Sequence, residues 1–403
     1  MPFCGVLGNL GFTDGGTGLT ELGLAAPPKR PLQIVITVPW GERLGGAENF
    51  LWTFLRHADR RQVKPTVVFF AGGPFEQEVA GLGIETIVLR AGRLRNLASL
   101  ARTVRQTSEV LRSANPDLIV NWSAKTQLYG AVAARLAGLG DRVVWWQHGL
   151  PNGHWMDRLA TLLPSRAIGC CSTTAMLAQS AQWPHRRTCV VYPGIDPPAT
   201  LPEAERRVLR DRLGIVPDRV VIGIVGRLQP WKGQDRFLMA IASLSRRGFP
   251  VHGLIVGGNA HGLSPGYEAQ LHELTRSLEL DGMVTFTGQV PEAGPYIQLM
   301  DIAVNASIAE PFGLVVLEAM ALSVPVVAYA LGGPAEIIES DQSGLLVPAT
   351  DDRAFVAALE GLVSDHSRRQ ELGRSGLARF QSRFSAERMS QEMAVCLREL
   401  CPN

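Results

Sequence analysis

The sequence predicts an α/β protein made of two parallel β-sheets, each covered by helices. Three observations support this prediction. At 403 residues, the chain is too long for one ordinary hydrophobic core. Short apolar segments rich in β-branched residues alternate with helical patterns along the chain. A Pro-rich stretch at 193–205 interrupts this alternation, which then starts again.

In the first half, seven short apolar segments have the composition of buried strands, and helical patterns separate them. They lie at 32–38, 65–70, 84–89, 117–122, 142–147, 167–171 and 189–194. Buried strands that alternate with helices are typical of a parallel sheet with helices on both faces.

The second half repeats this pattern with six segments, and two or three helices finish the chain. The segments lie at 219–228, 251–258, 283–288, 301–307, 325–329 and 344–348. Ligands bind such sheets at the carboxyl ends of the strands. We therefore expect the functional side chains directly after the strands.

These patterns divide the chain into four parts. Residues 1–30 are rich in Gly, Thr and Pro and lack the basic segment that opens a secretory signal, so they are predicted to be a flexible tail or an over-extended start. Two domains are expected at 31–195 and 196–385, and a C-terminal helix at 386–403.

Composition places the protein among globular proteins of the cytoplasm. Hydrophobic residues make up 46% and charged residues 19% of the chain. No apolar run reaches the ~18–20 residues that span a bilayer. The six cysteines show no CxxC pair and no histidine at metal-ligand spacing. This pattern predicts free thiols in a reducing compartment and no metal site.

The charges are unevenly distributed. Residues 31–196 carry 18 Lys or Arg against 11 Asp or Glu, a net charge of +7, whereas 197–403 carry 19 against 24, a net charge of −5. A basic first half favours an anionic partner, either a phosphorylated acceptor or a membrane surface. The alternative is that scattered arginines only solvate helix faces.

One segment predicts peripheral membrane contact in particular. The arginine-rich helix at 93–112 places apolar residues roughly on one face, namely Leu94, Leu97, Ala101, Val104 and Leu111. The alternative is a stripe that faces the core, with a solvated back.

Two cations follow the first strand of the second half, in "GRLQPWKG". Arg227 and Lys232 lie five residues apart on the loop that leads into a helix opened by Gly233. A diphosphate offers two charged groups at a similar spacing, with Arg suited to a bidentate grip and Lys to a point charge. The pair therefore favours a diphosphate site over ordinary surface cations.

Two glutamates stand eight residues apart in "NASIAEPFGLVVLEAM". Pro311 fits the first turn of a helix expected at 312–322, so that Glu310 precedes the positive helix end. The free amides of Phe312, Gly313 and Leu314 would then face ligand oxygens.

Glu318 would lie two turns inside that helix, among apolar residues. A carboxylate there needs paired hydrogen-bond donors, and the vicinal hydroxyls of a ribose supply two. The alternatives are a surface helix residue for Glu318 and an N-terminal helix charge for Glu310.

Further strand ends carry weaker signals. Glycines follow three strands, as Gly45 and Gly46, as Gly257 and Gly258, and as Gly332 and Gly333 ahead of Glu336. Such turns allow backbone to approach a ligand but are also ordinary structural turns. His148 ends a strand of the first half and could form a hydrogen bond with a sugar hydroxyl or a phosphate, although a single histidine is more often structural.

Together these motifs resemble the retaining family-4 glycosyltransferases of GT-B fold, in which two Rossmann-like domains face each other across a cleft. The resemblance rests on Arg227/Lys232 and Glu310/Glu318, and on "GGAE" at 45–48, "QHG" at 147–149, "YPGID" at 192–196 and "GGPAE" at 332–336. It covers about 32–390 and is stronger in the second half.

The resemblance implies a role for each matching residue. Arg227 and Lys232 would hold the donor diphosphate, Glu318 the ribose and Glu310 the transferred sugar. The amides of 312–314 would contact sugar and phosphate, while Gly46 would let backbone approach the diphosphate. His148 would lie near the sugar in the acceptor-binding domain 31–195, and Gly288 and Val290 would flank the base.

The implied activity is transfer from a UDP- or GDP-sugar to a hydroxyl of a glycan, lipid-linked or small acceptor, by front-face displacement. No cofactor, no metal and no nucleic acid is expected, and the C-terminal helix would pack back on the first domain. Membrane contact would be peripheral, on the inner membrane face. The alternative is a catalytically silent nucleotide-sugar-binding or scaffold subunit, against which the four intact residues argue. Glycan phosphorylases of this fold bind pyridoxal phosphate through a lysine. Lys232 is the one lysine of the second half and is already assigned to the diphosphate, so a phosphorylase is disfavoured.

Overall fold

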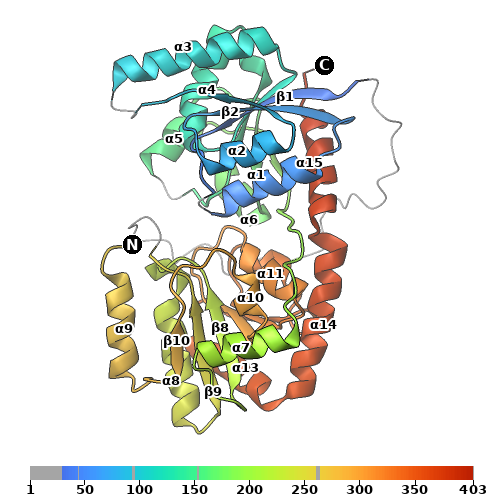
Figure 1. Cartoon of the computed structure of the whole chain (residues 1–403). Coiled ribbons are helices and arrows are strands. Elements are labelled where there is room, and N and C mark those ends of the chain that lie inside the picture. The colour runs from blue at the N-terminus through green and yellow to red at the C-terminus, as the bar shows by residue number, and fades with distance from the viewer. Residues whose placement is uncertain (1–29, 44, 93–95, 152–153, 260–263, 403) are drawn as a thin grey trace.

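The computed structural model shows two α/β domains, one above the other in Figure 1. The residues that it describes are 30–43, 45–92, 96–151, 154–259 and 264–402. The predicted tail lies outside the described residues except for Arg30, and so does Cys4. The fold class predicted from the sequence is confirmed, because both domains are parallel sheets covered by helices.

The N-terminal domain holds a seven-stranded parallel sheet in the order β3-β2-β1-β4-β5-β6-β7. The strands are β1 (Leu32–Val38), β2 (Val63–Phe69), β3 (Glu85–Val88), β4 (Leu118–Asn121), β5 (Val143–Gln147), β6 (Ala167–Cys170) and β7 (Thr188–Val190). The helices are α1 (Gly46–His57), α2 (Pro74–Gly81), α3 (Leu97–Ala114), α4 (Ala124–Leu136), α5 (Trp155–Leu162) and α6 (Thr173–Ser180), with a 3-10 turn at Gly140–Arg142.

The C-terminal domain holds a six-stranded parallel sheet in the order β10-β9-β8-β11-β12-β13. The strands are β8 (Val220–Val225), β9 (Val251–Val256), β10 (Val284–Phe286), β11 (Ile302–Asn305), β12 (Val326–Tyr329) and β13 (Leu345–Val347). The helices are α7 (Glu203–Arg212), α8 (Gln234–Arg246), α9 (Tyr267–Ser277), α10 (Gly294–Ile297), α11 (Leu314–Ala321), α12 (Pro334–Ile337) and α13 (Asp352–Ser364), with a 3-10 turn at Pro230–Lys232.

All thirteen predicted strands overlap a strand of the structure. Most strand residues are fully buried, as in β4, β5 and β9, because helices cover both faces of each sheet. Apolar β-branched side chains fill these positions, which is why the composition alone located the strands.

The C-terminal helices connect the two domains. The chain runs from α14 (His366–Arg383), beside the C-terminal domain, into α15 (Ala386–Glu399), beside the N-terminal domain. Ile195, in the Pro-rich stretch 193–205 that connects the domains, donates to the Phe384 carbonyl at 3.2 Å and accepts from the Ala386 amide at 3.1 Å. Met389, Met393 and Leu397 of α15 lie in the N-terminal core, against α1 and the sheet. The two segments in which the chain passes from one domain to the other are therefore hydrogen-bonded to each other.

The apolar stripe predicted for membrane contact is exposed at the start of α3 and buried further along the helix. In α3, Val104 and Leu111 face the core, whereas Leu97 is 75% exposed and Ala101 is exposed. The buried side of the helix also carries Thr103, Thr107 and Ser108, so the C-terminal part of the stripe faces the core, as the alternative predicted, and peripheral membrane contact stays a prediction. Leu94 lies outside the described residues. No helix within the described ranges is long and apolar enough to cross a bilayer.

Five cysteines lie within the described ranges, all as free thiols. Cys170 and Cys171 are buried, and Cys189, Cys396 and Cys401 are half-buried.

We predict that α15 contributes to the stability of the N-terminal domain. Met393→Ala removes a side chain that is 0% exposed in that core, so the free energy of unfolding should fall by about 2–5 kcal/mol. Urea unfolding measures it, with the exposed Gln391→Ala on the same helix as control. Equal stability of the two variants would contradict the packing of α15.

Candidate active site

The carboxyl ends of β8 and β11 bring the predicted cation and carboxylate together. These strands are neighbours in the sheet, so the loops that follow them meet. Lys232 ends the 3-10 turn after β8, and its Nζ lies 2.6 Å from Oε2 of Glu310, after β11. The ion pair is nearly buried, with the Lys232 side chain 16% and the Glu310 side chain 8% exposed.

Neighbouring side chains complete this ion pair. Ser307 Oγ donates to the same Oε2 of Glu310 at 3.2 Å. The Lys232 ammonium also lies 4.3 Å from the ring centroid of Trp231, a cation–π contact. Arg227, on the same loop, is half-buried and makes no ion pair with any described residue. Its carbonyl accepts from Gln234 Nε2 at 3.0 Å, which ties the loop to α8.

The helix after Glu310 begins later than the sequence predicted. Helix α11 starts at Leu314, and Gly313 precedes it with φ of 102°, a left-handed conformation that no helical residue adopts. Pro311 therefore lies in the loop, and Glu318 lies one turn inside the helix, not two. The backbone amides of Phe312, Gly313 and Leu314 have no acceptor among the described residues.

Glu318 has the environment of a ligand-binding carboxylate. It makes no hydrogen bond or ion pair with the described part of the chain. Its neighbours Val316, Leu317 and Met320 are buried. Burial raises the pKa of Glu318 to about 7. A carboxylate without donors inside the protein is suited to donors from a ligand.

A glycine turn packs against the backbone of Glu310. The Gly333 amide donates to the Glu310 carbonyl at 3.0 Å. At Gly332, where φ is 64°, a Cβ would lie 2.1 Å from that same carbonyl oxygen. The turn therefore requires glycine because it packs directly against the backbone of Glu310.

Glu336, three residues further on, contacts the opposite domain. Its carboxylate accepts from the amides of Thr173 and Thr174 at 2.7 and 2.8 Å, at the start of α6. The hydroxyls of Thr174 and Tyr192 donate to it at 2.7 and 2.9 Å. The sequence placed Glu336 only in a glycine motif, and the structure shows it joining the two domains.

His148 and its aromatic neighbours belong to the N-terminal domain. His148 follows β5, and its ring lies edge-on to Phe50 and tilted against Trp122, with centroids 6.1 and 4.7 Å away. Its Nε2 is buried and has no hydrogen-bond partner among the described residues. Burial lowers the pKa of His148 to about 3, so the ring is neutral near pH 7.

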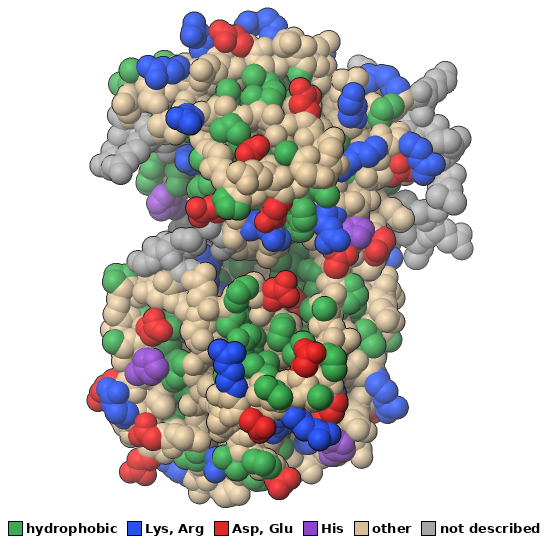
Figure 2. Space-filling model, in the orientation of Figure 1, with side chains coloured by type: hydrophobic (Ala, Val, Ile, Leu, Met, Phe, Trp, Pro, Cys, Tyr) green, Lys and Arg blue, Asp and Glu red, His purple; other side chains and the backbone are tan. Residues whose placement is uncertain are grey.

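Gly46 of the N-terminal domain lies close to Leu314 of the C-terminal domain. A Cβ on this first residue of α1 would lie 3.4 Å from Leu314 Cδ1 across the cleft. Figure 2 shows the surface hollowed between the two domains.

Gly288 and Val290 lie at the same edge of the C-terminal sheet, beyond β10. The Gly257 amide donates to the Gly288 carbonyl at 3.1 Å, and Val290 is partly buried.

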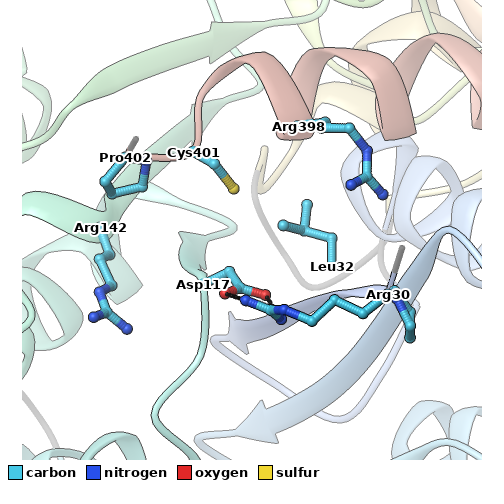
Figure 3. Close-up of a pocket in the computed structure, with 8 residues that line it drawn as sticks. Arg30, Leu32, Asp117, Arg142, Arg398, Cys401 and Pro402 are labelled. Atoms are coloured by element: carbon cyan, nitrogen blue, oxygen red, sulfur yellow. Dashed lines mark hydrogen bonds and ion pairs between the residues drawn. The ribbon is translucent and has the colours of Figure 1, made fainter. Parts of the chain in front are cut away.

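A separate cavity of about 330 Å³ lies at the opposite end of the N-terminal domain (Figure 3). It adjoins the amino ends of β1 and β4, near Leu32, and the bidentate Arg30–Asp117 pair borders it at 2.7 and 2.8 Å. Since ligands of parallel sheets bind at the carboxyl ends, this cavity is not the candidate site.

Comparison with known proteins agrees with this geometry. The model described as "Glycosyltransferase Family 4" matches residues 44–198, and the model "Glycosyl transferases group 1" matches residues 205–379. The two facing Rossmann-like domains and these two matches together define the family. The chain belongs to the family-4 glycosyltransferases of GT-B fold.

Curated relatives match about half of the chain. D-inositol 3-phosphate glycosyltransferase of Stackebrandtia nassauensis is 35% identical over 50% of this chain and 47% of its own length. Lipopolysaccharide core biosynthesis mannosyltransferase LpsB of Rhizobium meliloti is 32% identical over 52% of this chain and 60% of its own length. The chain thus spans about half the length of the curated relatives it matches.

Among solved structures, Anabaena Alr3699/HepE in complex with UDP-glucose is similar over nearly the whole chain. The TM-score is 0.76 at 26% identity, with 91% of this chain and 100% of that chain covered. The lipopolysaccharide glycosyltransferase WaaG shares the fold, with a TM-score of 0.68 at 15% identity over 90% of this chain and 99% of that chain.

We predict that Glu318 makes the stability of the protein depend on pH. Its pKa rises from 4.5 to about 7 on folding, so the folded chain holds a proton that the unfolded chain has lost between these values. Stability therefore falls as pH rises through this window. In the parent protein, ionisation of Glu318 should lower the free energy of unfolding by about 3 kcal/mol by pH 8. The Glu318→Gln variant should not show this decrease.

Urea unfolding at pH 5 and pH 8 measures this effect. The exposed Glu292→Gln, on the same domain, serves as control and should keep the pH dependence of the parent. A Glu318→Gln variant with the same pH dependence as the control would show that Glu318 is not buried in this way.

Proposed function

We propose that the protein is a retaining glycosyltransferase that moves a sugar from a UDP- or GDP-sugar to a hydroxyl acceptor. The observation that carries the proposal is the cluster at the carboxyl ends of β8 and β11, where the Lys232–Glu310 ion pair lies just before the unbonded amides at the start of α11 and Arg227 lies on the same loop as Lys232. This cluster combines cations, free N–H groups and a carboxylate, which is the chemistry that a sugar diphosphate requires.

The donor would bind with its diphosphate between Arg227, Lys232 and the amides of 312–314. Lys232 would exchange its contact with Glu310 for phosphate oxygens, which frees the carboxylate of Glu310 for sugar hydroxyls. Glu318 would accept from the ribose hydroxyls, which would supply the donors that its half-buried carboxylate lacks. Gly288 and Val290, on the β10 side of the same edge, would flank the base. The UDP-glucose complex of the similar HepE structure supports a uridine donor.

In the proposed front-face displacement, the bond from sugar C1 to the phosphate oxygen breaks, and a bond from C1 to the acceptor oxygen forms on the same face. The acceptor proton passes to the departing phosphate. Arg227 and Lys232 stabilise the negative charge that develops on the diphosphate. Neutral His148 would present Nε2 as an acceptor to a sugar hydroxyl. The acceptor is a glycan, a lipid-linked sugar or a small molecule, and no metal is required.

Nucleotide binding tests the donor site. UDP, GDP, ADP, CMP and dTDP should be compared in a thermal-shift assay with and without chelator, because a ligand of the native state raises the melting temperature. We expect a shift with UDP or GDP that persists with chelator. Absence of a shift with every diphosphate would contradict the proposal.

Arg227→Ala is the sharpest variant, since Arg227 has no ion pair to lose within the described structure. It should weaken binding of the diphosphate about tenfold or more and leave the melting temperature of the free protein unchanged. Calorimetric titration measures the affinity, with the exposed Arg246→Ala as control. Unchanged affinity in Arg227→Ala would remove Arg227 from the site.

The stereochemical outcome tests the mechanism. With an α-linked nucleotide sugar, the product should carry an α-glycosidic bond, which proton NMR of the fresh product reads directly from the anomeric coupling. A β-linked product would exclude front-face displacement.

A further inference from the structure

Lys125 is a cation that the donor site does not use. It is the second residue of α4, directly after β4, and therefore lies at the carboxyl edge of the N-terminal sheet. The chain has only four lysines, and Lys125 is one of the two that follow a strand at the carboxyl edge of a sheet, the other being Lys232.

The position of Lys125 does not favour a positive charge in the folded protein. The side chain is half-buried and has no carboxylate partner among the described residues. Burial lowers the pKa of Lys125. The charge also lies in the first turn of α4, which has no acidic residue, where the helix dipole repels a cation. A cation kept in such a place is suited to an anion that arrives from outside.

Two groups of the cleft wall lie beside Lys125. Its Nζ lies 5.6 Å from the ring centroid of Trp40, which follows the neighbouring strand β1. Trp40 Nε1 donates to Glu48 Oε1 at 2.9 Å. Glu48 lies in the first turn of α1, where burial raises its pKa, and the charge of Arg227 on the other domain is close enough to oppose that rise. Lys125 therefore belongs to the wall that faces the donor site.

The first turn of α4 is held firmly in place. Asn121 Nδ2 donates to Gln127 Oε1 at 2.8 Å, and Thr37 Oγ1 donates to Asn121 Oδ1 at 2.7 Å. All three side chains are fully buried. This network fixes the backbone that carries Lys125 against β1 and β4, as a preorganised binding group requires.

We infer that Lys125 binds an anionic group, a phosphate or a carboxylate, on the acceptor substrate, with the Trp40 ring beneath the same subsite. The inference rests on the proposed function, because it assigns the acceptor side of that cleft. The donor diphosphate already has Arg227, Lys232 and the amides of α11 on the opposite domain. The net charge of +7 for residues 31–196, from 18 basic and 11 acidic residues, agrees with an anionic acceptor on this domain.

Matched pairs of probe sugars test the inference. Glucose against glucose 6-phosphate, myo-inositol against its 3-phosphate, and glucose against glucuronate differ only in the anionic group. Binding of each to the UDP- or GDP-saturated protein is measured by calorimetric titration, with inorganic phosphate alone as a further probe. We expect the wild type to bind at least one charged member about tenfold more tightly than its neutral partner.

Lys125→Ala should abolish that preference, and Lys125→Arg should retain most of it. Lys64→Ala, which removes an exposed lysine of the same domain, should behave as the wild type. Binding of the nucleoside diphosphate itself should be unchanged in Lys125→Ala, which separates this inference from the proposed donor site.

Three results would overturn the inference. These are a wild type that prefers no charged member of any pair, a Lys125→Ala variant that keeps the preference, and a Lys125→Ala variant with weakened diphosphate binding. The last would assign Lys125 to the donor. A preference for the phosphates alone or for glucuronate alone identifies which anion the subsite takes.

Discussion

The ion pair between Lys232 and Glu310 is the contact on which the candidate site depends. Both side chains are nearly buried, so either charge alone would be costly, and each holds the other at the carboxyl edge of the sheet. In the function we propose, the donor phosphate takes the place of Glu310 beside Lys232, and the sugar hydroxyls take the place of Lys232 beside Glu310. The charges are then satisfied both with and without donor.

The same short segment serves the donor site and the contact between the domains. Gly332 and Gly333 support the backbone of Glu310, and Glu336, just beyond them, accepts four hydrogen bonds from Thr173, Thr174 and Tyr192. A change in the relative position of the domains would therefore pull on the turn that carries Glu310. In the proposed function, this links domain closure to donor binding.

Much of the fold could be predicted from the sequence because buried strands require apolar β-branched residues. Lys232 and Glu310, which the sequence places after two different strands, are in contact in the structure although 78 residues separate them, because carboxyl strand ends meet at one edge of the sheet. The start of α11 was misplaced because Pro311 fits a first turn, whereas Gly313 with its left-handed φ sets the boundary. The roles of Glu336 and Lys125 could not be predicted, since they depend on contacts between separate loops, which no local pattern encodes.

The central claim is that Lys232, Arg227 and the start of α11 form a diphosphate site. A crystal structure of the chain with UDP or GDP tests it most directly. We predict that the β-phosphate lies between Lys232 Nζ and the amides of 312–314, with the ribose hydroxyls on Glu318 and the Lys232–Glu310 contact lengthened. A nucleotide bound elsewhere, or one bound here with its base toward α11 and its phosphates in solvent, would contradict the claim.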